Sequence, residues 1–121
     1  KNEKAVNHTI NNWLQAKTLV ENNGGKFFFI LQPVSFFYNT KTDHVLEFSK
    51  IQNKDQSFSK SIVSFYDLVG KKLNDNYFFL DLKDVFNNKF EYIYIDLNTH
   101  LFPDGYSEII NAFDNKFKNE F

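Results

Sequence analysis

Three short apolar runs alternate with longer segments of helical spacing, and this alternation limits the fold more than any other feature of the chain. The runs are KFFFILQ (26–32), YFFLDL (77–82) and EYIYID (91–96), and each has the length of one β-strand. KFFFILQ is apolar on both faces, as expected for a strand inside a parallel sheet. Strands that alternate with helices indicate α/β layering with a mostly parallel sheet.

The segments around these runs predict three helices. The first runs from about Lys4 to Glu21 and ends at NNGG, because glycine readily adopts the left-handed conformation of a helix end. The second covers residues 58–69 and ends near Gly70. The third starts at Asp104 to Tyr106. We expect its buried face to consist of Ile109, Ile110, Phe113 and Phe117.

The composition excludes several classes of site. The chain has 14 basic residues, all of them lysines, and 15 acidic residues, so its formal charge is −1 and favours neither nucleic acid nor an anionic membrane. Without arginine, the chain cannot build a bidentate guanidinium clamp for phosphate. Without cysteine, it has no disulfide, thiolate metal site or Cys nucleophile. No apolar run is long enough to span a bilayer, and the cellular compartment stays open.

Two polar residues after the third run are candidates for catalysis. In open α/β sheets, ligands bind beyond the carboxyl ends of the strands, where Asp96 and His100 would lie. A carboxylate that orients an imidazole fixes its tautomer and stabilises the imidazolium, as the base of a Ser-His-Asp site requires. The alternatives are a surface-loop histidine and a strand-end turn former, because Asp and His occur at this spacing by chance in many proteins.

The block YIDLNTHLFPDGYSEIINAF resembles the last conserved block of the SGNH (GDSL-like) hydrolases, where an Asp and a His follow the final strand. His100, Leu101, Gly105 and Tyr106 fall at matching places. WLQAKTLVENNGGKFFFILQPVSFF and FFLDLKDVFNN are similar in layout to earlier family segments. The resemblance implies a three-layer flavodoxin-like α/β fold with a mostly parallel sheet. It also implies a serine esterase or acyltransferase that acts on O-acyl groups of a carbohydrate or other small molecule, with no metal or organic cofactor.

On this resemblance His100 is the general base and Asp96 orients its ring. The chain departs from the family in two ways. Asp96 lies four residues before His100 rather than the usual three, and Leu97 fills the usual place. The family's blocks with the nucleophilic Ser and with the oxyanion-hole Gly and Asn are also missing. We therefore expect residues 1–121, which begin at Lys1, to be the C-terminal part of a single domain that is inactive alone.

Other polar residues have plainer interpretations. Asp81 is expected to be a turn residue, with a role as the acid partner of His100 as its alternative. Asp104 is expected to be an N-cap or turn residue beside the following glycine. Ser35 lacks the glycine setting of a nucleophile elbow, and His8 is expected to face solvent. An ordinary loop is favoured over a metal site for three further residues: Asp43, His44 and Glu47.

The alternative function is a non-catalytic α/β module, either a degenerate SGNH relative or a binding domain. Residues 34–57 form a long irregular segment, and its aromatic side chains could contact a partner. His100 separates the two functions, because an enzyme fails without it and a binding module tolerates Ala there. A phosphate- or nucleotide-binding flavodoxin relative is disfavoured, since no glycine-rich turn leads from a strand into a helix.

Overall fold

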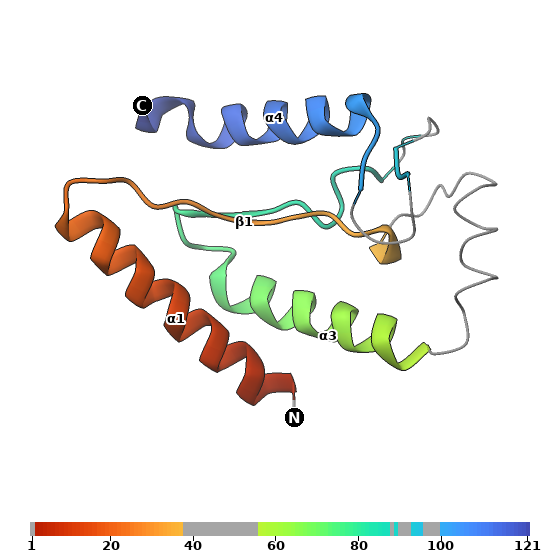
Figure 1. The fold of residues 1–121 in the computed structure, drawn as a ribbon, viewed down its shortest axis with the longest axis horizontal. Coiled ribbons are helices and arrows are strands. Elements are labelled where there is room, and N and C mark those ends of the chain that lie inside the picture. The colour runs from red at the N-terminus through yellow and green to blue at the C-terminus, as the bar shows by residue number, and fades with distance from the viewer. Residues whose placement is uncertain (1, 38–55, 88, 90–92, 96–99) are drawn as a thin grey trace.

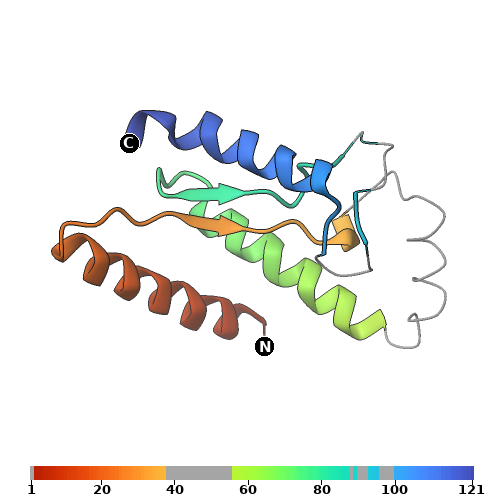
Figure 2. The ribbon, with the colours of Figure 1, turned by 45° about the horizontal axis from the view of Figure 1, so that its top comes forward.

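The computed structural model describes residues 2–37, 56–87, 89, 93–95 and 100–121. Its elements in chain order are α1 (Asn2–Asn22), β1 (Phe29–Leu31), the 3-10 helix η1 (Ser35–Phe37), α3 (Gln56–Leu73), β2 (Phe79–Asp81), α4 (Pro103–Phe117) and the 3-10 helix η2 (Lys118–Glu120). α1 and α3 lie on one side of the two strands and α4 lies on the other side (Figures 1 and 2). None of the described helices combines the length and apolar character needed to cross a bilayer.

α1 ends at the glycine pair, as the sequence predicts. Gly24 has a left-handed φ of 79°, and its N–H donates to the carbonyl of Glu21 at 3.0 Å. The N–H of Gly25 donates to the carbonyl of Val20 at 3.0 Å. These bonds satisfy carbonyls that have no partner within the helix. The predicted first helix is therefore confirmed.

α3 continues past Gly70 to Leu73, so the helix end predicted near Gly70 is wrong. Instead of ending the helix, this glycine allows two charged side chains to approach the helix closely. A Cβ atom at Gly70 would lie 3.1 Å from Oδ2 of Asp81 and 3.7 Å from Nζ of Lys83. The missing side chain therefore leaves room for these two charged groups against the helix.

β1 and β2 form a parallel pair in which Phe29 lies beside Phe79 and Leu31 beside Asp81. The N–H of Phe29 donates to the carbonyl of Phe78 at 2.7 Å, and the N–H of Leu82, directly after β2, donates to the carbonyl of Leu31 at 3.0 Å. The helical segment between the strands lets them run in the same direction. These two strands confirm the first two predicted strands, although each is shorter than its apolar run.

The main core lies between the strands and the pair α1 and α3. Phe29 stacks on Phe79 with ring centroids 5.7 Å apart, and Trp13 of α1 lies 3.7 Å from the ring of Phe29. Phe28 points to the other side, where its ring contacts Phe117 of α4 at 4.4 Å. The neighbouring side chains of Phe28, which precedes β1, and Phe29, its first residue, therefore serve opposite faces. The buried members of the main core are Val6, Ile10, Leu31, Val34, Tyr66, Val69, Leu73, Phe78 and Phe79.

Residues 93–95 do not extend this sheet, and the prediction of a third parallel strand at 91–96 is wrong for the described part of that range. The Ile95 N–H donates to the His100 carbonyl at 2.8 Å, and the Phe102 N–H donates to the Ile93 carbonyl at 2.8 Å. Residues 93–95 therefore pair antiparallel with 100–102, around an isolated bridge between Tyr94 and Leu101. Pairing with a nearby segment closes a much shorter loop than pairing across a crossover.

The predicted fold class is wrong as well. The described residues are mostly helical and hold a parallel sheet of only two strands, so the chain does not have the three-layer flavodoxin-like fold of SGNH hydrolases. The first two apolar runs form strands that alternate with helices, as predicted. The error lies in the number of strands, because an alternating apolar run fits a local antiparallel pair as well as a parallel strand.

α4 begins one residue before the predicted range, at Pro103. Its N-cap is Phe102, which makes no side-chain capping bond, and Asp104 lies in the first turn. A carboxylate in the first turn favours the helix because the N-terminus carries partial positive charge. Phe117 is buried as predicted, whereas Ile110 is 65% exposed and does not belong to the buried face.

Candidate functional site

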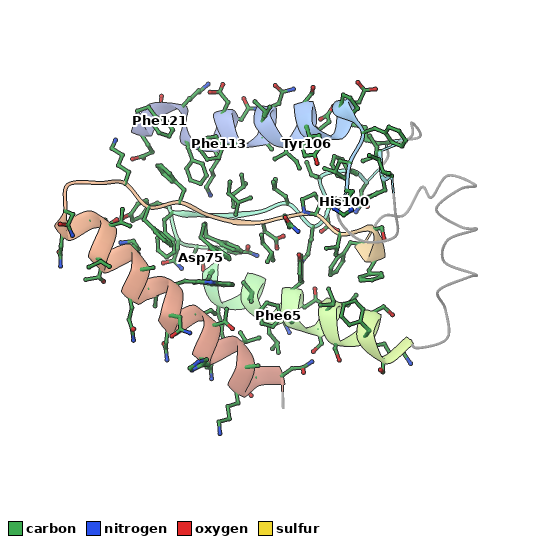
Figure 3. All side chains as sticks on the ribbon, in the orientation of Figure 1. Phe65, Asp75, His100, Tyr106, Phe113 and Phe121 are labelled. Carbon is green, nitrogen blue, oxygen red and sulfur yellow. The ribbon has the colours of Figure 1, made fainter. Side chains whose placement is uncertain are left out.

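His100 lies at the end of the molecule where β1 leads into η1 (Figure 3). Its side chain is exposed, and its backbone belongs to the antiparallel pair that precedes α4. Asp96 and Leu97 lie outside the described residues. The structure therefore does not test whether a carboxylate orients the imidazole, and the catalytic roles of both residues stay predictions.

Ser35, the serine that follows β1, is fully buried. A nucleophile must be reached by substrate, so this burial supports the structural interpretation of Ser35. His8 is exposed on α1, which confirms that it faces solvent. Asp43, His44 and Glu47 lie outside the described residues. No group of three or more potential metal ligands lies together in the part of the chain that the structure describes.

Asp81 acts as a turn residue at the end of β2. Its Oδ1 accepts the backbone N–H of Lys83 at 2.9 Å, which is the local bond that favours Asp at strand ends. Its Oδ2 lies 3.5 Å from Nζ of Lys83, and the same ammonium group lies 3.3 Å from Oδ1 of Asp67 on α3. Both oxygens of Asp81 therefore face Lys83, which supports the turn interpretation over a role as the acid partner of a histidine.

Lys83 joins the end of β2 to α3. Burial alone would lower the pKa of its ammonium group, but the carboxylates of Asp81, Asp67 and Asp84 outweigh burial and raise this pKa above its ordinary value. The ammonium group also lies 5.9 Å from the centre of the Phe37 ring. Lys83 therefore offsets part of the negative charge at this edge, and Gly70 provides the space in which Lys83 and Asp81 meet.

Tyr66 of α3 ties the helix to the carboxyl end of β1. Its hydroxyl donates to the backbone carbonyl of Gln32 at 2.9 Å. Burial raises the pKa of the Tyr66 hydroxyl above its ordinary value, and the negative charge of Asp81 raises it further. The protonated phenol is therefore the form that the folded state favours.

We expect Tyr66→Phe to lower the free energy of unfolding at pH 7 by about 0.5–1.5 kcal/mol, because one hydrogen bond is lost. Since the folded-state pKa of Tyr66 is raised, its contribution is complete below the unfolded pKa near 10 and is lost as the pH rises through the folded pKa. The difference between wild type and Tyr66→Phe should therefore shrink above pH 10. Urea denaturation at pH 7, 9 and 10.5 measures it, and a difference that stays constant over this range contradicts the assignment.

A surface hollow of about 510 Å³ lies along β2. It is lined by residues 80–85 together with Asn74, which directly follows α3, and Ala112 of α4. These two helices cover opposite sides of the strand pair (Figure 2). Because residues from both sides line one hollow and no residue of β1 does, the hollow lies beside the outer edge of β2.

The outer edge of β2 has backbone groups that bond to no other described residue. Within the described residues, β2 pairs only with β1. The carbonyl of Phe78 and the N–H of Leu82 point to β1, so the backbone groups of Phe79 and Asp81 point away from it. Of these two residues, Asp81 lines the hollow. The N–H of Phe79 donates to the Asn76 carbonyl at 3.1 Å. The carbonyl of Phe79 and the backbone N–H and carbonyl of Asp81 have no backbone partner on this side among the described residues.

This edge was not predicted, because residues 91–96 were expected to belong to the same sheet. One signal was present: the apolar residues 93–95 are followed by the mostly polar residues 96–100 and by two more apolar residues, a pattern that also suits a hairpin. Gly70 and Lys83 carried no local signal, since their roles depend on contacts between elements distant in the sequence.

The chain matches no protein-family model, no curated protein and no solved structure. The similarity to the SGNH block around His100 therefore stays a resemblance, and the function has to be argued from the geometry.

Proposed function

We propose that the domain is a non-catalytic binding module that holds an extended polypeptide segment along the outer edge of β2. The observation that carries this proposal is the hollow of about 510 Å³ beside a strand edge whose outward backbone groups lack partners in the described part of the chain. An added strand supplies donors and acceptors at the spacing of these groups, which is the physical basis of β-strand addition.

The walls of the hollow suit a strand better than a compact ligand. The α4 wall is Ala112, whose small side chain leaves space beside Leu80. The α3 wall ends at Asn74, which is exposed. A segment between these walls would have both of its faces partly covered, so its apolar side chains would gain burial in addition to backbone hydrogen bonds.

The described residues support a binding function more directly than a catalytic one. A serine esterase needs an accessible nucleophile, a base and an orienting acid in mutual contact. Among the described residues Ser35 is buried and the carboxylate of Asp81 faces Lys83. The serine esterase function therefore remains a sequence-based prediction, whereas the β2 edge supports a binding function through groups that the structure describes.

A strand-forming peptide tests the proposal. We expect an acetylated and amidated peptide of alternating Thr and Val, flanked by Lys, to shift the amide NMR signals of residues 79–83 in the ¹⁵N-labelled chain. Asp81→Pro should weaken this binding by about fivefold or more, because it removes one outward N–H and a hydrogen bond is worth roughly 1 kcal/mol. Proline is tolerated here because this N–H does not bond to β1.

Asp81→Ala is the matched control, since it removes the same carboxylate but keeps the N–H. Binding to Asp81→Ala should stay within about twofold of wild type, because the backbone donor is unchanged. Equal affinities of the Pro and Ala variants, or signal changes confined to other elements, contradict binding at the β2 edge.

A further inference from the structure

We propose that the natural occupant of the β2 edge is β2 of a second copy of this chain, running antiparallel to the first. The two copies would then share one continuous sheet of order β1-β2-β2-β1. This inference rests on the proposed binding function and names its partner. Around a two-fold axis the same edge serves both copies, so one set of groups is enough for a closed contact.

The direction of the backbone groups sets the possible registers. In an antiparallel pair, outward-pointing residues must face outward-pointing residues if both are to exchange hydrogen bonds. Phe79 and Asp81 point outward, so Phe79 can face Asp81 of the second copy, with Leu80 on the two-fold axis. In this register the N–H of each Asp81 donates to the carbonyl of Phe79 in the other copy, and both of these groups are unpaired within the described residues.

Charge favours the register with Leu80 on the two-fold axis over the register with Asp81 on the axis. Moving the two-fold axis by one residue would place the two Asp81 side chains directly opposite each other, and like charges at such positions are unfavourable. With Leu80 on the axis, two apolar side chains face each other on the side of α4, where Ala112 and Leu80 line the hollow.

The charge of the chain is compatible with a second copy. The rim of the hollow carries Asp81, Asp84 and Lys83, so its negative excess is small. The net charge of −1 adds little repulsion between two copies. A sheet of two three-residue strands is also small, since stable sheets commonly have at least three strands. Pairing through β2 extends the sheet of both copies at once.

A single introduced cysteine tests the register. The chain has no cysteine, so any disulfide in a variant comes from the introduced residue. Leu80 and its symmetry mate form a non-hydrogen-bonded pair, whose Cα separation of about 4.5 Å lies within the range of a disulfide. Under mild oxidation, Leu80→Cys should therefore form a covalent dimer at least about tenfold faster than Leu19→Cys, because self-pairing raises the effective thiol concentration.

Two controls accompany this measurement. Leu19 is 67% exposed on α1, so Leu19→Cys reports random collision. Asp81→Cys lies next to Leu80 on the same edge but faces Phe79 of the second copy, so it should cross-link more slowly than Leu80→Cys. Sedimentation equilibrium of the wild type should give twice the mass of one 14.4 kDa chain at high concentration, and Asp81→Pro should remain a monomer.

The outcomes separate this inference from the proposed function. Equal cross-linking of Leu80→Cys and Leu19→Cys, faster cross-linking of Asp81→Cys, or a dimer that persists in Asp81→Pro overturns the assigned pairing. A monomeric wild type that still binds the Thr-Val peptide at residues 79–83 overturns only the identity of the partner. Failure of both the dimer and the peptide overturns the binding function as well.

Discussion

Replacing Phe79 with Ala is expected to lower the free energy of unfolding by roughly 3–5 kcal/mol, the largest effect of any change considered for this chain. Phe79 is only 1% exposed and stacks on Phe29 between the two strands, with an interplanar angle of 10°. Removing its ring leaves a cavity where β1, β2 and α3 meet, and the surrounding rings of a packed core collapse only partially into such a space.

Urea denaturation followed by far-UV circular dichroism measures this loss. Phe121→Ala is the matched control because Phe121 is 80% exposed, and its loss should be below about 1 kcal/mol. If Phe79→Ala does not fold at all, Phe79→Leu should still fold with a loss of about 1–2 kcal/mol, since it keeps most of the buried volume. Similar losses for Phe79→Ala and Phe121→Ala contradict the described core.

Gly105→Val should cost about 1–3 kcal/mol because it overpacks the contact between α4 and the antiparallel pair that carries His100. Gly105 is buried in the first turns of α4. A Cβ atom there would lie 3.1 Å from Cβ of Leu101 and 3.3 Å from Cγ2 of Ile93. Valine adds two further methyl groups, so the paired segment must move away from the helix, and the imidazole NMR signals of His100 should shift with it.

Asn111→Val is the control for Gly105→Val. Asn111 is exposed on the same helix, so the change introduces the same β-branched side chain without a steric clash. We expect its effect on the free energy of unfolding to stay within about 0.5 kcal/mol and the His100 signals to stay in place. Val has a better helix propensity than Gly and about the same as Asn, so propensity does not predict a loss in either variant. If both variants lose the same stability, a clash at Gly105 does not explain the loss, and the contact is wrong.

Local sequence signals predicted the helices well. The end of α1 follows from the ability of glycine to adopt positive φ, and Gly24 does so. The buried face of α4 was predicted less well, because Ile110 has the spacing of an inward residue but is 65% exposed. Spacing defines a stripe on a helix, whereas the width of the neighbouring layer decides how much of that stripe is covered. A sheet of two strands covers less than the expected three.

The sheet and the site could not be predicted to the same extent. Alternation at Ile93 to Ile95 does not reveal whether the partner strand is near or distant in the sequence, so the third strand and the fold class derived from it were wrong. Asp81 was recognised as a turn residue because its bond to Lys83 is local. The outer edge of β2 had no such local signal. It is open because no further described strand pairs with β2.

The two outer edges of the strand pair differ, and this difference limits how far copies of the chain could polymerise. At the carboxyl end of β1, Pro33 has no N–H to offer an incoming strand. The neighbouring carbonyl of Gln32 is already occupied by the Tyr66 hydroxyl. Within β1, the backbone groups of Ile30 point to the outer edge, since Phe29 and Leu31 bond toward β2. A two-fold contact consumes the β2 edge in both copies, so a further chain would have to be held at the shorter β1 edge.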